Sequence, residues 1–254
     1  MNLLLINASP RRERSLSRQL ANAFVSQWLD LRPTDVVVQR DVGIDHPPLL
    51  TEAWIAACFT PEDQRAQSQR DVLAYSDAAI EQLARADILL IATPRYNYGM
   101  PAALKAWFDQ VIRINRTFSF DRTEKTWPLS PLLSGKKLVL MSASGEFAFQ
   151  PGGLRESWEH LEPHVRTCAR YLGVAPGDVH HIAIEYQEFG DERHQASLQR
   201  AWEEAKTLAS RLAGERSAHG CHSSQGRTVL ETEASVPTWS TTQDLRTCPN
   251  PDSA

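Results

Sequence analysis

ADILLIATPRYNYGMP, residues 86–101, contains a strand pattern, a polar loop and a helix start in direct succession. The apolar run 86–92 is continuous rather than alternating, which is typical of a strand buried on both faces of a parallel sheet. The loop 94–99 contains two tyrosines, an asparagine and an arginine. Pro101 then favours a helix start, because the missing N–H of proline is not needed at the first helical position. A strand that leads through a loop into a helix is the repeating unit of α/β folds.

The rest of the chain repeats this alternation. Four further apolar runs predict strands, two of them with a strong pattern and two with a weaker one; they are 2–7, 137–142, 35–40 and 179–185. Apolar residues at helical spacing predict the helices 16–31, 71–85, 101–114, 163–172 and 192–212. Five strands separated by helices predict an α/β fold, a flavodoxin-like doubly wound five-stranded parallel sheet with strand order 2-1-3-4-5.

The sheet and its helices are predicted to form one domain, residues 1–213, followed by a disordered tail, residues 214–254. The tail is rich in Ser, Thr, Pro and Gly and has no sustained apolar periodicity. It contains three residue types that bind metals, at His219, Cys221 and His222. No fourth ligand follows at the spacing of a metal site, so we predict no metal.

Composition narrows the class of protein. The 254 residues are 42% hydrophobic and 23% charged, with a formal net charge of −4, which suits a globular protein and lacks the basic character of a nucleic-acid-binding domain. No apolar stretch is long enough to cross a membrane, and the N-terminus lacks the pattern of a signal peptide. The four cysteines are widely spaced, which favours reduced thiols in a cytoplasmic protein. We therefore expect no nucleic acid and no membrane as partner.

Ligands of parallel α/β sheets bind beyond the carboxyl ends of the strands, near the point where the strand order reverses. The first strand leads into a loop and helix start that contain Ser9, Arg11, Ser15, Leu16 and Ser17. A helix N-terminus binds phosphate through free N–H groups, and hydroxyls and a cation strengthen such a site. The loop has no glycine, so it is neither a Walker loop nor a GxGxxG turn. These residues predict a monophosphate site; the alternative is a helix cap with surface arginines.

Two more strand ends have unusual composition. The loop after residue 92 offers flat aromatic faces and an amide, and its candidate ligand residues are Pro94, Arg95, Tyr96, Asn97 and Tyr98. The segment after residue 141 consists of small residues that let the backbone approach a ligand closely, and its candidates are Ser142, Ala143, Ser144 and Gly145. The alternatives are a tyrosine loop packed on its own helix and a simple turn. Together, the three strand ends predict one site for a planar, phosphorylated ligand.

These residues resemble the FMN-dependent NADH-azoreductase family, which belongs with the flavodoxin-like quinone reductases. The most specific part is Pro94-x-Tyr96-Asn97-Tyr98 running into Pro101-x-x-Leu104-Lys105-x-Trp107-x-Asp109 and Thr117-Phe118. The similarity spans roughly residues 1–210 and includes Ser9-Pro10-Arg11 with Ser15 and Ser17, Leu133-x-Gly135-Lys136-Lys137 before Ser142-x-x-Gly145, and Tyr171-Leu172-Gly173-Val174.

The resemblance implies bound FMN, whose phosphate would lie in the serine loop, whose isoalloxazine would lie against residues 94–98 and whose pyrimidine side would meet residues 142–145. It also implies a homodimer with active sites at the subunit interface. NADH or NADPH would pass a hydride to flavin N5 and leave, and a quinone or azo compound would then accept the electron pair in the same slot, a ping-pong cycle. We nominate no side chain as acid or base, because the flavin carries the chemistry.

Three positions depart from the family pattern. The place of Arg95 is commonly apolar in the family, and a cation that pointed at the flavin would favour the anionic reduced ring. Residues 143–145 are Ala-Ser-Gly, whereas the family usually has a sequence similar to Arg-Gly-Gly at these positions. Phe120 falls where the family often has a tyrosine, so we predict that it lies in the substrate pocket. These departures concern the substrate more than the cofactor.

Two other classes stay open. A flavodoxin-type electron carrier would bind FMN without an organic substrate, although such carriers are usually small and strongly acidic. A non-catalytic flavin-binding regulatory protein would have its nicotinamide slot blocked by Arg95 or by the tail.

Overall fold

Five parallel strands form the centre of the computed structural model, which describes residues 1–215. They are β1 (Asn2–Asn7), β2 (Val36–Asp41), β3 (Ile88–Pro94), β6 (Lys136–Ala143) and β7 (Val174–Ile184). Their order in the sheet is β2-β1-β3-β6-β7, and every pairing is parallel. The predicted order 2-1-3-4-5 and the flavodoxin-like fold are thereby confirmed.

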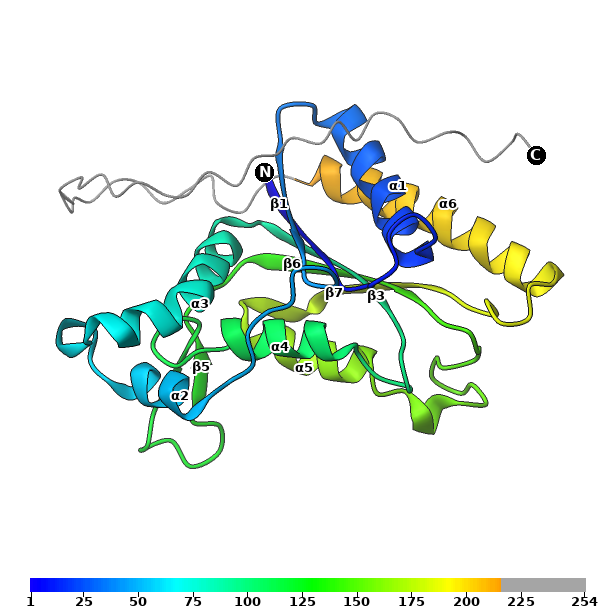
Figure 1. Cartoon of the computed structure of the whole chain (residues 1–254). Coiled ribbons are helices and arrows are strands. Elements are labelled where there is room, and N and C mark those ends of the chain that lie inside the picture. Colours follow the sequence, from blue (N-terminus) through cyan, green and yellow to red (C-terminus); the bar gives the residue numbers. More distant parts are fainter. Residues whose placement is uncertain (216–254) are drawn as a thin grey trace.

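Helices cover both faces of the sheet (Figure 1). One face carries α1 (Leu16–Leu31) and α6 (Glu192–Gly214), and the other carries α3 (Gln67–Arg85), α4 (Ala102–Val111) and α5 (Glu162–Tyr171). Because successive residues of a strand point to opposite faces, each central strand contributes to two cores. On β1, Leu3 and Leu5 pack under α1 and α6, whereas Leu4 and Ile6 pack towards α4.

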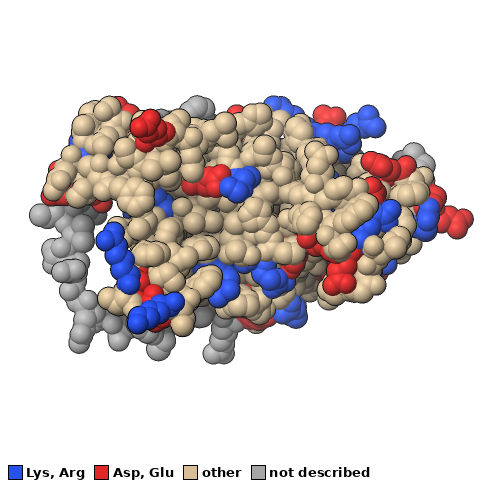
Figure 2. Space-filling view, turned by 90° about the horizontal axis from the view of Figure 1, so that it is seen from below, with Lys and Arg blue, Asp and Glu red and all other residues tan. Residues whose placement is uncertain are grey.

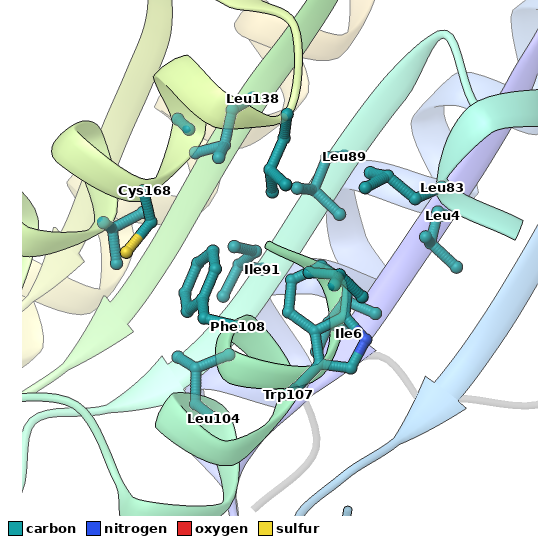
Figure 3. Packing of buried hydrophobic residues seen from close by; sticks show 14 of the residues in the cluster. Leu4, Ile6, Leu83, Leu89, Ile91, Leu104, Trp107, Phe108, Leu138 and Cys168 are labelled. Atoms are coloured by element: carbon teal, nitrogen blue, oxygen red, sulfur yellow. The ribbon is translucent and has the colours of Figure 1, made fainter. Parts of the chain in front are cut away.

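The core on the α4 side contains the largest aromatic residues of that helix (Figure 3). Trp107 and Phe108 are at most 1% exposed, and they pack with Ile6, Ile91 and Leu138 of three neighbouring strands. Two large aromatic side chains buried on one helix fix the position of α4. The loop that precedes α4 is therefore presented from a rigid element.

The long connection between β2 and α3 has secondary structure of its own, which the sequence pattern did not predict. It contains α2 (Glu52–Phe59) and a short 3-10 helix, η1 (Glu62–Gln64). Thr51 caps α2, and Trp54 of α2 donates through Nε1 to Gln110 Oε1 of α4 at 2.9 Å. Such a short helix depends on tertiary contacts of this kind, which a local pattern does not reveal.

Three smaller elements were also absent from the prediction. They are the antiparallel pair β4 (Phe118–Phe120) and β5 (Leu129–Pro131), and the 3-10 helix η2 (Glu156–Trp158). Strands of three residues are too short to show an alternating pattern.

Two helix ends have residues that suit them. Ser15 caps α1, and Gly173 follows α5 with a φ of +85°, the left-handed conformation that glycine adopts readily at a helix end. The two prolines are one position off: Pro101 is the residue before α4, and Pro163 is the second residue of α5. Both positions still suit proline, because the first N–H groups of a helix have no partner within it.

The C-terminal helix α6 runs to Gly214, two residues beyond the predicted end. The predicted tail, 214–254, otherwise lies outside the described residues from 216 onward, together with His219, Cys221 and His222. Within residues 1–215, no helix has the length and apolar character needed to cross a membrane.

Candidate functional site

A pocket of about 330 Å³ lies at the carboxyl ends of β1, β3 and β6. The helices that follow β1 and β3, α1 and α4, cover opposite faces of the sheet, so the pocket stands at the switch point where this fold binds ligands. Most of the predicted cofactor residues line it: Ser9, Arg11, Ser15, Leu16, Ser17, Pro94, Arg95, Tyr96, Ala143 and Gly145. Three further residues complete the lining: Arg14, Gln187 and Glu188.

Three buried serines line the pocket. Ser9, Ser15 and Ser17 are at most 4% exposed, and the Oγ atoms of Ser15 and Ser17 lie 3.3 Å apart. Arg11 and Arg14 are exposed at the pocket, and neither forms an ion pair with another described residue. Hydroxyl donors, the N-terminus of the 16-residue helix α1 and unpaired cations are the chemistry of a phosphate site.

Arg18 holds this serine loop in place from behind. Its guanidinium donates to both carboxylate oxygens of Asp41 at 2.7 Å, and it also donates to the carbonyl oxygen of Ser9. Gly43 passes so close that a Cβ atom there would lie 2.3 Å from the same carbonyl oxygen. The contacts with Asp41 and Gly43 could not be predicted from the sequence, because they join segments far apart in the chain. The loop is therefore held in shape by the protein itself.

The tyrosine loop forms a tight turn over residues 96–99. Tyr96 and Gly99 exchange two backbone hydrogen bonds of 3.0 Å, and the residues between them, Asn97 and Tyr98, have φ angles of +48° and +67°. Two left-handed residues in succession define a type I′ turn. Asparagine tolerates this conformation, whereas a tyrosine in it is strained by about 1–2 kcal/mol.

Contacts behind the turn hold Tyr98 in this conformation. Its carbonyl oxygen accepts from the N–H of His160 at 3.1 Å, its hydroxyl donates to Glu146 Oε1 at 3.2 Å, and its ring meets the ring of Trp158 edge-on at 5.1 Å. Asn97 and Tyr98 are not among the lining residues of the pocket. The pocket wall in this region consists of Pro94, Arg95 and Tyr96.

The charge of Arg95 is neutralised by Glu159. Both guanidinium ends of Arg95 contact the carboxylate at 2.6 Å, and the Cζ atom lies 3.9 Å from the ring centroid of Phe149. The Arg95 side chain is 3% exposed and that of Glu159 is 12% exposed. Arg95 thus borders the pocket, but it does not present an unpaired cation there.

Glu159 connects this pair to α5. Its Oε1 accepts from the backbone N–H groups of Leu161 and Glu162 at 2.8 and 2.9 Å, at the start of the helix. Burial acts to raise the pKa of Glu159, but hydrogen bonds from Arg95 and from these amides outweigh it, so the pKa lies below its usual range. The carboxylate is therefore ionised and holds Arg95 and α5 together.

At the carboxyl end of β6, some of the predicted residues line the pocket and others point to the interior. Ser142 Oγ lies 2.8 Å from His181 Nε2, and Ser144 Oγ donates to the carbonyl oxygen of Glu146 at 3.2 Å. Their neighbours Ala143 and Gly145 line the pocket instead. Alternate residues of an extended segment point to opposite sides, which explains this division.

His181 gives the fold a pH dependence. Burial lowers its pKa to about 4; nearby Glu159 and Glu162 act against this shift, and Arg95 and Arg166 add to it. A histidine in the unfolded chain titrates near 6.5, so the unfolded state binds the proton first as the pH falls. We expect stability to decline as the pH drops from about 6.5 towards about 4, and His181→Gln to remove part of that decline.

Chemical denaturation at about pH 7 and about pH 5 measures this effect. The expected result is a smaller loss of unfolding free energy on acidification in His181→Gln than in the wild type. An equal loss in both proteins would contradict the assignment to His181.

The segment 185–190 forms a further wall that the sequence analysis did not include. It connects β7 to α6 and brings Gln187 and Glu188 into the lining. A polar segment directly after the last predicted strand, at the same edge of the sheet, was the available signal.

Phe120 lies on β4, where its side chain is 49% exposed. It is not among the residues that line the pocket. Its predicted place in a substrate pocket therefore stays a prediction.

The lining residues fit FMN. Serines, arginines and the N-terminus of α1 suit its phosphate, and the flat faces of Pro94 and Tyr96 suit its ring system. Neither a histidine nor a cysteine lines the pocket. Among residues 1–215, no group of three or more His, Cys, Asp or Glu residues could hold a metal ion.

The sheet order and the pocket at the switch point define a doubly wound α/β protein with the flavodoxin-like strand order. The family model described as "Flavodoxin-like fold" matches residues 1–208. An FMN-dependent NADH:quinone oxidoreductase of Idiomarina loihiensis is 48% identical over 199 residues, which cover 78% of this chain and 82% of the relative. One from Colwellia psychrerythraea is 45% identical over 219 residues, covering 84% and 99%.

This chain belongs to the family of FMN-dependent NADH:quinone oxidoreductases with the flavodoxin-like fold. Its structure is also similar to a solved FMN-dependent NADH-azoreductase from Bacillus anthracis in complex with FMN. The TM-score is 0.73 at 21% sequence identity, with 84% of this chain and 99% of that chain covered. The structural similarity supports the fold.

Proposed function

We propose that this chain is an FMN-dependent NAD(P)H oxidoreductase that reduces quinones, azo compounds or both. The observation that carries the proposal is the pocket at the switch point, which combines a hydroxyl and arginine cradle with a flat wall. FMN, when bound, takes up and passes on the hydride, and the protein binds and orients it. The relatives named FMN-dependent NADH:quinone oxidoreductases support the same reaction.

The predicted FMN residues divide into two sets in this proposal. Those that line the pocket contact the cofactor: the serine cradle holds the phosphate, and Pro94 and Tyr96 face the ring. Tyr98, Ser142 and Ser144 shape the wall from behind through the contacts described above, and Asn97 does so as a left-handed residue of the turn 96–99. No lining side chain is assigned as a catalytic acid or base.

The donor and the acceptor share one slot in this proposal. Tyr96 is 40% exposed, so the flat wall is reached from solvent. A nicotinamide and a quinone or azo compound are both flat and can stack in turn on the same ring face. Such alternation gives ping-pong kinetics, with parallel lines in double-reciprocal plots.

The environment of Arg95 argues against the alternative of a non-catalytic regulatory protein. A cation that blocked the nicotinamide slot would need a free guanidinium at the pocket, whereas the guanidinium of Arg95 is paired with Glu159 and 3% exposed. This observation favours an enzyme over a non-catalytic flavin-binding protein.

Steady-state NADH or NADPH oxidation by the FMN-loaded protein, with a quinone as acceptor and no other protein present, separates the three classes. An enzyme turns over many times under these conditions, whereas an electron carrier or a regulatory protein does not. Protein that cannot be loaded with FMN would contradict the proposal as a whole.

We also propose that the chain is a homodimer with its active sites at the subunit interface. Figure 2 shows a face with a broad uncharged area, within which a few acidic and basic side chains also lie, and depletion of charge is typical of interface cores. Large apolar side chains are exposed on α2, on the β4–β5 hairpin and near η2: Ile55, Phe59, Phe120, Leu132, Leu154 and Trp158. Sedimentation equilibrium should give twice the mass of one chain; the monomer mass would contradict this proposal.

A cytoplasmic location is part of the proposal as well. Its support is that Cys58 and Cys168, the cysteines within the described residues, are free and buried, as is usual for proteins of reducing compartments.

A further inference from the structure

We propose that Glu188, assisted by Gln187, binds the ribityl chain of FMN. This inference rests on the proposed function, because it assigns a part of the same pocket to a part of the same cofactor. Gln187 and Glu188 are the lining residues that come from the β7–α6 connection, a segment to which the sequence pattern assigned no role.

The backbone of the β7–α6 connection is pinned against the third strand end. The N–H groups of Tyr186, Gln187 and Glu188 donate to the carbonyl oxygens of Glu146, Ser144 and Gly145, at 3.2–3.3 Å. Tyr186 has a φ of +63°, a left-handed conformation that is unusual for a tyrosine. These contacts fix the backbone positions of residues 187 and 188, from which their side chains extend.

An aromatic cluster holds the connection on its outer side. The rings of Phe147 and Tyr186 stack with their centroids 4.3 Å apart, and Phe189 meets Phe147 edge-on at 5.7 Å. The guanidinium of Arg193 in α6 lies 4.8 Å from the ring centroid of Phe189 and 5.1 Å from that of Tyr186. Stacking and cation–π contacts restrain the connection even though Phe189 is 47% exposed.

The side chain of Glu188 lies over Gly145 at the pocket. A Cβ atom on Gly145 would lie 2.6 Å from Cγ, Cδ and Oε1 of Glu188, so the side chain occupies the space that this glycine leaves open. The carboxylate forms no hydrogen bond or ion pair with another residue of the range 1–215. An ionised carboxylate only accepts hydrogen bonds, so a ligand at this position should be a donor.

The ribityl chain carries several such donors, its hydroxyl groups, whereas the ring system carries one, N3–H, which lumiflavin also has. In the proposed function, Ser9, Ser15 and Ser17 hold the phosphate, and Pro94 and Tyr96 face the ring; all five line the pocket. The hydroxyl groups of the ribityl chain lie between these parts of the molecule. A carboxylate would repel the phosphate dianion, whereas it accepts hydrogen bonds from hydroxyls at no such cost.

Three flavins test the assignment in full-length apoprotein by fluorescence quenching. FMN has the phosphate and the ribityl chain, riboflavin has the ribityl chain alone, and lumiflavin has neither. Glu188→Ala is expected to raise the Kd of FMN and of riboflavin by about tenfold each and to leave the Kd of lumiflavin unchanged, because hydrogen bonds to a charged group are lost. Glu192→Ala, an exposed carboxylate in the first turn of α6, is the matched control and should change none of the three.

Gly145→Ala provides a second route to the same result. Its new methyl group should displace the flexible Glu188 side chain while the carboxylate remains in the protein. We expect the same loss of FMN and riboflavin affinity, and no additional loss when Gly145→Ala is combined with Glu188→Ala.

The outcomes separate this inference from the proposed function. Wild-type protein that binds no FMN would overturn both. Wild-type protein that binds FMN, with unchanged FMN and riboflavin affinity in Glu188→Ala, would overturn the ribityl assignment alone. An equal loss for lumiflavin would also overturn it, because the residue would then act on the ring.

Discussion

Replacing Glu159 with glutamine is expected to lower the free energy of unfolding by about 3 kcal/mol, because it leaves the guanidinium of Arg95 buried without its counter-charge. The Arg95 side chain is 3% exposed and that of Glu159 is 12% exposed, and the two groups make contacts of 2.6 Å. Urea denaturation at neutral pH measures the loss. Glu162→Gln is the control. It removes the ion pair between Glu162 and Arg166 within α5, which is more exposed than the pair of Arg95 and Glu159. It should change stability by less than about 1 kcal/mol.

The same substitution should weaken FMN binding. Arg95 leads directly into the turn 96–99, in which Tyr98 is held in a left-handed conformation. When Arg95 loses its partner, we expect the turn to relax. FMN binding then has to restore the strained conformation at a cost of about 1–2 kcal/mol, which corresponds to about a tenfold higher Kd of FMN. The double variant Arg95→Met, Glu159→Gln should be more stable than Glu159→Gln alone. A single variant as stable as the wild type would contradict this view of the pair.

Acid should weaken this pair in the wild type. The pKa of Glu159 lies below its usual range in the folded state, so the pair contributes fully above the unfolded value of about 4.3 and loses its contribution as the pH falls through the folded value. The pH range of this effect lies below most of the pH range assigned to His181. Glu159→Gln should therefore flatten the most acidic part of the stability profile, whereas His181→Gln acts above it.

Ser17→Ala is expected to raise the Kd of FMN by about 10- to 100-fold and to leave the Kd of riboflavin unchanged. The Ser17 hydroxyl is 1% exposed and lies 3.3 Å from that of Ser15 in the cradle. A hydrogen bond to a charged phosphate contributes about 1.5–3 kcal/mol, and riboflavin has no phosphate to lose it. Flavin fluorescence titration measures both constants.

Ser26→Ala is the matched control for this variant. Ser26 lies on the same helix, α1, but is exposed and away from its N-terminus. It should leave FMN binding unchanged. Equal losses for FMN and riboflavin in Ser17→Ala would contradict the phosphate assignment.

The sheet and the central part of the site could be predicted because their signals are local. Continuous apolar runs define β1, β3 and β6, and the serines after β1 stand directly at a helix start. Parallel strands place their carboxyl ends at one edge, so the loops after 7, 92 and 142 had to meet. The structure places Ser9, Tyr96 and Gly145 around one pocket accordingly.

The rest of the site depends on contacts between distant segments. The position of Arg95 within its loop does not reveal Glu159, which lies 64 residues further along the chain. Arg18 reaches Asp41 across 23 residues, and Gln187 reaches the pocket only because its backbone bonds to Ser144. Likewise, α2 is held by Gln110, 56 residues away. No local pattern contains these pairings.

Anaerobic reduction and reoxidation of the FMN-loaded protein tests the proposed oxidoreductase activity without a second protein. NADH or NADPH is expected to bleach the flavin absorbance in the absence of any acceptor, and an equimolar quinone is then expected to restore it. A flavin that the nicotinamide does not reduce, or that the quinone does not reoxidise, would contradict the proposed oxidoreductase.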